Sequence, residues 1–217
     1  LSLRHKVDLC VFSEGKEDSR GIDEMGKYCG RVETVLLPKM QSYLNVLRSL
    51  VNGRPLQVNY YYSKMMERKV KEISLSCDYD IVHIVLQRMM PYADCCNGKK
   101  LVLDQIDALS LNMKRRSVAE SNIIKKAFFF YEYMLMRRYE RANEKRYDAA
   151  IITSAVDKTA LGDEGITVIS NGVDTAYFMP AETRKDIDII FTGNMNYFPN
   201  VDAAVYLCQE IVPRIKK

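Results

Sequence analysis

Residues 79–86 read YDIVHIVL, a short run in which apolar side chains follow one another almost without interruption. Parallel strands that are covered on both faces have this character, whereas half-buried strands alternate apolar and polar residues. Six further short runs, most of them equally continuous, predict strands at residues 6–12, 31–37, 99–104, 148–154, 166–169 and 187–192. Together these runs predict a parallel sheet with cover on both faces.

Helical periodicity separates the runs. Apolar side chains recur on one stripe in residues 58–77, in residues 117–146 and again after Pro199. This is the pattern of a helix that packs one face on a core. Strands that alternate with helices indicate an α/β doubly wound fold, with a Rossmann-like parallel sheet and flanking helices.

A linker follows the sixth run. This stretch contains the turn residues Asn171, Gly172 and Pro180, and a charged segment follows them. Such a composition is typical of a domain boundary. A single βα unit remains after it, and such a unit cannot bury both of its own faces. We therefore expect that unit to pack on the first domain or on a second copy in a homo-oligomer. The expected division is a Rossmann-like domain at 1–170, a linker at 171–186 and the start of a second domain at 187–217.

The overall composition is that of an ordinary globular protein. The chain has 217 residues, of which 47% are hydrophobic and 28% charged, as expected of one or two soluble domains. Its net charge of +4 is too small to indicate a nucleic-acid partner. The six cysteines include no CxxC pair and the chain has two histidines, so we expect no metal site. We expect reduced thiols in a cytoplasmic protein.

Several segments, taken in order, carry a resemblance. They are YDIVHIVLQRMMPYA at 79–93, KLVLDQIDALS at 100–110, YERANEKRYDAAIITSAVDKTAL at 139–161, NGVDTAYF at 171–178 and IIFTGNMNYFPNVDAAVYL at 189–207. These motifs resemble family 4 glycosyltransferases, which have the GT-B architecture of two Rossmann-like domains. The last segment is most similar to bacterial sugar transferases of the exopolysaccharide-associated, PEP-CTERM-system type. The resemblance covers most of the chain.

The resemblance implies a chain truncated at both ends relative to the family. The family opens with a strand and a glycine-bearing loop, and it carries an acidic donor-binding motif well beyond the position of Lys217; neither is in this sequence. The expected content is most of the acceptor-side domain and the first βα unit of the donor-binding domain. Because half of the donor site would be missing, we expect weak or no turnover from this chain alone.

The resemblance also implies an activity for the parent protein. It would be a hexosyltransferase-type enzyme that moves a sugar from a nucleotide-diphosphate donor to an acceptor hydroxyl in polysaccharide or glycolipid synthesis. It would need no metal, and no cofactor besides the nucleotide sugar, which is its donor substrate. The implied acceptor is a carbohydrate or a lipid-linked carbohydrate, and the implied location is the cytoplasm or the inner membrane surface.

The donor-binding candidates are Gly193, Asn194, Met195, Asn196 and Asn200. A glycine after a strand lets the backbone approach a ligand closely. Asn200 is expected to cap the next helix through its side-chain oxygen, and free N–H groups at a helix start favour a diphosphate. The resemblance implies that the donor diphosphate or sugar lies here. The alternative is a structural turn with an asparagine cap.

The catalytic candidates are Asp104 and Asp107, which follow the run at 99–104. The carboxyl edge of a doubly wound sheet is where ligands bind. A spacing of three residues points both carboxylates the same way if a helical turn begins there. One of them would then orient an acceptor hydroxyl or act as a base. The alternative is that Asp104 caps the next helix and that Asp107 is solvated or paired with Arg115 or Arg116.

Two acceptor-binding candidates, Gln87 and Arg88, leave the edge of the run at 79–86. They are expected to contact the acceptor or a donor phosphate, although a surface arginine is more often simply solvated. His83 lies inside the same run and is expected to be a core histidine with a hydrogen-bond partner.

A basic, aromatic stretch at residues 114–146 holds ten Lys and Arg against four Glu. The simplest interpretation is an amphipathic core helix with basic residues on its wet face. The alternative function is a non-catalytic Rossmann-like module that binds a membrane or a protein partner through this helix, because a basic aromatic helix can lie on anionic lipid. A third hypothesis, a dinucleotide enzyme, has no GxGxxG fingerprint in the sequence to support it.

Overall fold

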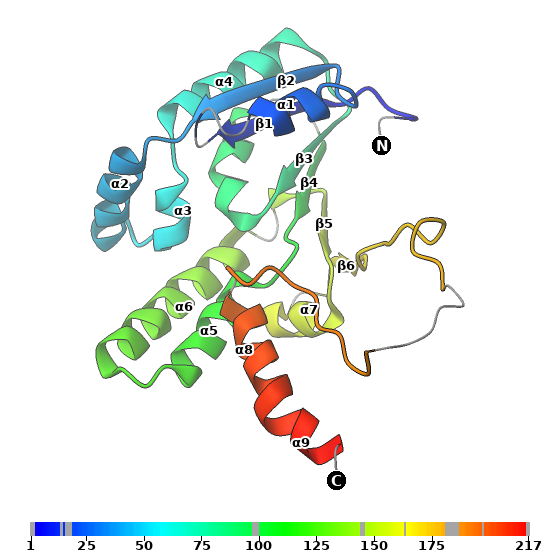
Figure 1. Cartoon of the computed structure of the whole chain (residues 1–217). Coiled ribbons are helices and arrows are strands. Elements are labelled where there is room, and N and C mark those ends of the chain that lie inside the picture. Colours follow the sequence, from blue (N-terminus) through cyan, green and yellow to red (C-terminus); the bar gives the residue numbers. More distant parts are fainter. Residues whose placement is uncertain are drawn as a thin grey trace. The chain divides into compact units, whose positions relative to one another are not determined.

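Figure 1 shows the computed structural model of the chain, which describes residues 3–13, 15, 19–96, 100–143, 146–162, 164–180, 187–196 and 198–215. The chain forms two compact units, Leu1–Asn171 and Gly172–Lys217. The division falls at the start of the predicted linker 171–186, of which residues 181–186 lie outside the described part.

All paired strands of the first unit run parallel. A two-stranded sheet pairs β1 (Asp8–Ser13) with β2 (Arg31–Leu36). A four-stranded sheet contains, in this order, β3 (Ile81–Val85), β4 (Lys100–Asp104), β5 (Ala149–Ile152) and β6 (Ile166–Val168). These strands confirm the predicted α/β class with parallel strands and are compatible with a Rossmann-like fold. Lys99, predicted as a strand residue, lies outside the described residues.

The helices of the first unit connect the strands (Figure 1). They are α1 (Ser19–Met25), α2 (Lys39–Asn52), α3 (Leu56–Tyr60), α4 (Lys64–Ser76), the 3-10 helix η2 (Gln87–Cys95), α5 (Leu109–Ala119), α6 (Ile123–Asn143) and α7 (Ala155–Leu161).

Two predicted helices begin later than expected because polar side chains start a new helix. Ser63 interrupts the helix predicted at 58–77, since its backbone is extended and its hydroxyl accepts the Met66 N–H at the start of α4. Asn122 does the same in the helix predicted at 117–146. Its side-chain oxygen accepts the N–H groups of Ile124 and Lys125 at 3.0 and 3.1 Å.

Burial alternates along β3, and this corrects the prediction that the strands are covered on both faces. Ile84 is 7% exposed, whereas Ile81 and Val85 are 57% and 46% exposed. Ile84 packs with Leu103 of β4 and Met90 of η2. The described helices therefore cover one face of β3 and leave apolar residues of the other face open. An apolar run of sequence shows that a strand can be buried on both faces, but it does not show which faces other elements cover in the fold.

Tyr92 of η2 connects the two-stranded sheet to the rest of the unit. It packs with Val35 of β2 and Met66 of α4 in one buried cluster. Its hydroxyl accepts the Ser63 N–H at 2.7 Å and donates to the Tyr61 carbonyl at 2.6 Å. The Tyr92 side chain therefore contacts both the two-stranded sheet and the segment between α3 and α4.

The second unit contains a continuous helical stretch but no described strand. Its helix comprises α8 (Phe198–Tyr206), the π-helical segment η4 (Leu207–Ile211) and α9 (Val212–Ile215). The strand predicted at 187–192 is wrong, because these residues find no second strand to pair with in the described part of this unit. Every described side chain of the unit is exposed or half-buried. The expectation that its apolar helix face packs on the first domain or on a second copy stays a prediction.

Helix α6 supplies buried carboxylates to the first turns of two other helices. The two oxygens of Glu132 accept the N–H groups of Leu56 and Gln57 in α3, at 2.9 and 3.1 Å. Glu140 Oε1 accepts the Ser110 N–H of α5 at 3.2 Å. Neither α3 nor α5 has a side-chain cap of its own. A carboxylate near a helix start satisfies free N–H groups and complements the helix dipole.

Glu140 makes the stability of the fold depend on pH. Burial raises the pKa of its carboxyl to about 7, above the ordinary 4.5, although hydrogen bonds from the start of α5 lower it in part. The folded state then keeps a proton that the unfolded chain loses. Stability therefore falls as the pH rises from about 4.5 to about 7.

The Glu140→Gln variant cannot ionise and should lose this pH dependence. Relative to the variant, the wild type should lose up to about 3 kcal/mol of stability as the pH rises through this range. Urea unfolding at pH near 5 and near 7.5 measures the difference. Glu24→Gln, on the exposed side of α1, is the matched control and should keep the wild-type pH slope. Identical slopes for all three proteins would contradict the assignment.

Candidate functional site

Two strained backbone positions lie at the carboxyl ends of adjacent strands. Leu86, after β3, has φ 71°, and Ile106, two residues after β4, has φ 59°. A left-handed backbone is costly for a bulky or β-branched residue and persists only where the surroundings hold it. Here the Leu86 N–H donates to the Asp104 carbonyl at 2.7 Å, and the Thr153 hydroxyl donates to the Ile106 carbonyl at 2.8 Å. Such strain is concentrated at functional sites.

The Gln87 side chain connects the bend at Leu86 with the bend at Ile106. This side chain is fully buried, and Nε2 donates to Gln105 Oε1 at 3.1 Å and to the Asp107 carbonyl at 2.7 Å. Gln87 Oε1 accepts no hydrogen bond among the described residues. This predicted acceptor-binding residue therefore lies beneath the edge and positions the Asp107 backbone.

Arg88, the second predicted acceptor-binding residue, contacts α3. Its Nη2 donates to Gln57 Oε1 at 2.8 Å, and its guanidinium lies 5.1 Å from the ring centre of Tyr61. Gln57 is in turn held through its N–H by Glu132. The arginine is thus partnered rather than simply solvated, and a contact with acceptor or phosphate stays a prediction.

The two predicted catalytic carboxylates have different surroundings. Asp104 Oδ1 accepts the Ile106 N–H at 3.1 Å, and Asp104 Oδ2 lies 3.4 Å from His83 Nε2. Asp104 therefore holds the Ile106 bend and does not cap α5, whose first turn is held by Glu140. His83 has the expected partner, but its side chain is 41% exposed, so the prediction of a core histidine is wrong.

Asp107 is the carboxylate with the properties of an acid or base. Burial, and secondly the nearby Asp157, raise its pKa above the ordinary value. Its side chain makes no hydrogen bond or ion pair with the described residues, which include Arg115 and Arg116. A carboxylate whose basicity is raised and whose oxygens are available suits proton transfer.

Three residues of this edge were missed from the sequence. Gln105 is buried against Gln87, Thr153 holds the Ile106 carbonyl, and Asp157 accepts the Ala108 N–H at 3.3 Å. Asp157 lies in the first turn of α7, just after the Ser154 cap. The carboxyl-edge rule points to it as well, because it follows the run at 148–154.

The predicted donor loop lies in the second unit. A Cβ on Gly193 would lie 3.0 Å from Asn200 Nδ2, so a larger residue there would require the Asn200 side chain to shift. Asn200 Nδ2 donates to the Asn194 carbonyl at 3.0 Å, and the Asn196 N–H donates to Asn194 Oδ1 at 2.9 Å. Asn200 is the third residue of α8. The predicted cap through its side-chain oxygen is therefore wrong, since its amide N–H₂ folds back on the loop. Met195 is 50% exposed.

Metal-ligating groups do not gather in the described residues, where no cluster of three His, Cys, Asp or Glu side chains is placed to hold an ion. All six cysteines are free thiols. Within the same described part, no helix combines the length and the apolar character that crossing a bilayer requires.

No known protein-family model matches this sequence, and no curated protein matches it. Any assignment of function therefore depends on the geometry of the carboxyl edge and on the motifs of the sequence.

The strain at position 106 can be measured by comparing Ile106→Gly with Ile106→Ala. Both variants remove the side chain beyond Cβ, but only glycine, which lacks Cβ as well, adopts φ 59° without cost. We expect the glycine variant to be more stable in urea unfolding by about 1 kcal/mol. At Met134, which is exposed in the interior of α6, the order should reverse, because glycine weakens a helix interior relative to alanine. A more stable alanine variant at 106 would show that the bend is not strained.

Proposed function

We propose that the chain is the acceptor-side part of a GT-B-type sugar transferase, and that the acceptor hydroxyl binds at the carboxyl edge of the four-stranded sheet. The observation that carries the proposal is Asp107, a carboxylate of raised pKa that follows the strained Ile106 bend. The sequence motifs around this edge supply the sugar-transferase class.

In the proposed reaction Asp107 acts on the acceptor. The acceptor oxygen forms a bond to the anomeric carbon of the donor sugar, while the bond from that carbon to the diphosphate oxygen breaks. The proton of the acceptor hydroxyl passes to the Asp107 carboxylate, whose raised pKa increases its basicity. Asp104 and Gln87 contribute by holding the backbone on both sides of Ile106. The Arg88 guanidinium would bind the acceptor or a phosphate of the donor.

For the second unit we propose a contact with the donor diphosphate or sugar. The residues concerned are Gly193, Asn194, Met195, Asn196 and Asn200. Their mutual hydrogen bonds fix the loop that leads into α8. Backbone N–H groups at a helix start are suitable donors to phosphate oxygens.

Acceptor binding can be tested by NMR on the ¹⁵N-labelled chain, with methyl glucoside, methyl mannoside and methyl galactoside as probes. At least one glycoside should shift amide resonances of residues 86–88 and 104–108. Asp107→Asn should weaken that glycoside at least fivefold, because the amide cannot accept the hydroxyl proton bond as strongly. Asp23→Asn, on exposed α1, should bind as the wild type does. Shifts confined to other regions, or full binding by Asp107→Asn, would reject the proposal.

A second candidate function is association with an anionic membrane, and the α5–α6 hairpin favours it. Helices α5 and α6 pack against each other (Figure 1). At their connected ends, which we call the hairpin tip, large apolar side chains are exposed: Val118, Ile123, Ile124, Phe128 and Phe130, at 72%, 81%, 79%, 51% and 54%. Lys114, Arg115, Lys125 and Lys126 are exposed nearby. The first part of α6 is therefore not a core helix, contrary to the simplest interpretation of the sequence.

The hairpin tip has the two features that interfacial helices use, namely apolar side chains that enter the lipid and cations that bind anionic headgroups. The chain should sediment with vesicles of phosphatidylglycerol and phosphatidylcholine, and raising NaCl from 50 to 300 mM should weaken binding severalfold. Replacing Ile124 and Phe128 by serine should weaken it as well. Leu75→Ser, which alters an exposed apolar residue of α4, is the control. Equal binding to neutral vesicles would reject this function.

A further inference from the structure

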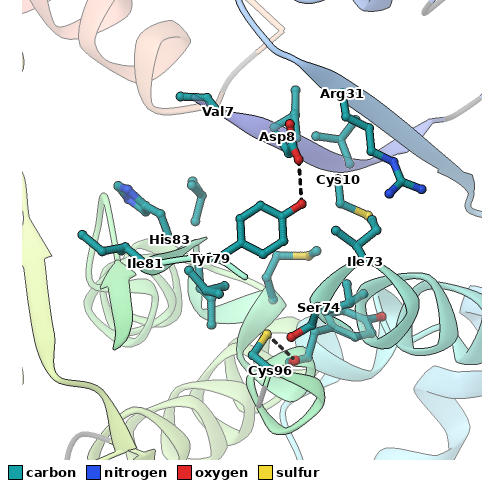
Figure 2. Close-up of a pocket in the computed structure, with 18 of the residues that line it drawn as sticks. Val7, Asp8, Cys10, Arg31, Ile73, Ser74, Tyr79, Ile81, His83 and Cys96 are labelled. Carbon is teal, nitrogen blue, oxygen red and sulfur yellow. Dashed lines mark hydrogen bonds between the residues drawn. The ribbon is translucent and has the colours of Figure 1, made fainter. Parts of the chain in front are cut away.

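An apolar cavity of about 480 Å³ separates the two sheets of the first unit, between β1 and β3. We call it the interstrand slot. Residues 5–12 line one side of it and residues 79, 81–85 line the other. Val70, Ile73 and Ser74 of α4 also line it. Figure 2 shows the slot with Ile73 and Ser74 on one flank and Ile81 and His83 on the other.

The slot lies between two strand edges that have no strand partner in the described residues. β1 pairs with β2 on one edge only, and β3 pairs with β4 on one edge only. No backbone hydrogen bond joins β1 to β3 among the described residues. Each of these edges presents a row of backbone N–H and C=O groups, which is a template for another strand.

β1 and β3 run in the same direction. At their amino ends, Tyr79 donates from its hydroxyl to Asp8 Oδ2 at 2.6 Å. At the carboxyl end of β1, Phe12 contacts Tyr92 of η2, which follows β3. Amino end therefore lies beside amino end, and carboxyl end beside carboxyl end. One inserted strand can be parallel to both neighbours at once, as every existing pair in the two sheets is.

One unsatisfied polar atom lies at the amino end of the slot. Asp8 Oδ2 receives the Tyr79 hydroxyl, but the buried Asp8 Oδ1 accepts no hydrogen bond from the described residues. Buried polar atoms in native proteins are nearly always partnered. A backbone N–H at the start of an inserted strand would supply the donor.

We propose that the interstrand slot binds one extended, apolar polypeptide segment as a parallel β-strand. The strand would join the two existing sheets into a single one, in the order β2, β1, inserted strand, β3, β4, β5, β6. Continuity with the two parallel sheets is what selects a polypeptide, because only a backbone satisfies both rows of donors and acceptors. The apolar lining selects β-branched and aliphatic side chains. This inference does not depend on the proposed sugar transfer.

A fluorescein-labelled peptide, KVVIVVIK, tests the proposal on the whole chain. Fluorescence anisotropy should show saturable binding. The matched peptide KVVPVVIK, which lacks a central N–H and cannot continue a ladder, should bind at least tenfold more weakly. Hydrogen exchange should show new protection of β1 and β3 amides. Equal binding of both peptides, or protection confined to the outer edges of β2 and β6, would overturn the proposal.

A larger side chain that fills the slot should prevent the peptide from binding. Ser74→Trp places a large ring in the slot and should reduce affinity at least tenfold. Leu75→Trp, at the neighbouring exposed position of α4, should bind within twofold of the wild type. If Ser74→Trp does not fold, the exchange footprint and the proline peptide on the wild-type chain still decide the matter.

Other occupants predict other results. A second copy of the chain in the slot would give a dimer in size-exclusion chromatography that Ser74→Trp abolishes. A small apolar ligand would be indicated if 8-anilinonaphthalene sulfonate binds the wild type, fails to bind Ser74→Trp, and is not displaced by KVVIVVIK. Either result would overturn the proposal that the occupant is a separate polypeptide segment.

Discussion

The two buried glutamates of α6 are the constraint on which the first unit depends. Glu132 holds the first turn of α3, and Glu140 holds the first turn of α5. Both helices begin next to the carboxyl edge of the sheet. Arg88 is bonded to Gln57 of α3, and Asp107 comes directly before α5. One helix therefore fixes the positions of the segments on both sides of the candidate site. A helix without a local cap relies on such a distant acceptor, because its free N–H groups cannot be left buried and unpaired.

The carboxyl edge combines rigidity with a polar group that is only partly satisfied. Gln87 fills the space beneath Leu86 and Ile106 and bonds to both β4-side partners, Gln105 and Asp107. Asp107 is the exception in this network, since its own carboxylate stays without a partner in the described part while Asp157 raises its pKa further. Several hydrogen bonds fix the backbone of this edge, whereas none to the described residues fixes the Asp107 carboxylate. That combination is what a binding or proton-transfer site requires, because a fixed backbone presents a side chain whose hydrogen bonds are still available.

The sequence predicted the strands well where a partner strand exists, and poorly where none does. The runs at 79–86 and 148–154 became β3 and β5, whereas 187–192 has the same apolar character and forms no strand. Strand formation depends on a neighbour that a local pattern does not contain. The carboxyl-edge rule pointed to Asp104 and Asp107, which lie at and just after the end of β4, but it could not separate the residue that holds a bend from the one whose pKa is raised. That distinction depends on Asp157 and on burial, which are tertiary effects.

Cysteine exposure differs between the thiols, and this has a practical consequence. Burial raises the pKa of the Cys96 thiol to about 11, and it also raises the pKa of Cys10 and Cys95. These three thiols are protonated at neutral pH and react slowly with alkylating agents, since the thiolate is the nucleophile. Cys77 in the first unit and Cys208 in the second are exposed, whereas Cys29 is half-buried. The native chain thus offers one exposed thiol in each unit. A donor and an acceptor dye, or two spin labels, can be introduced there without engineering a new site, and their separation reports the distance between the two units in solution.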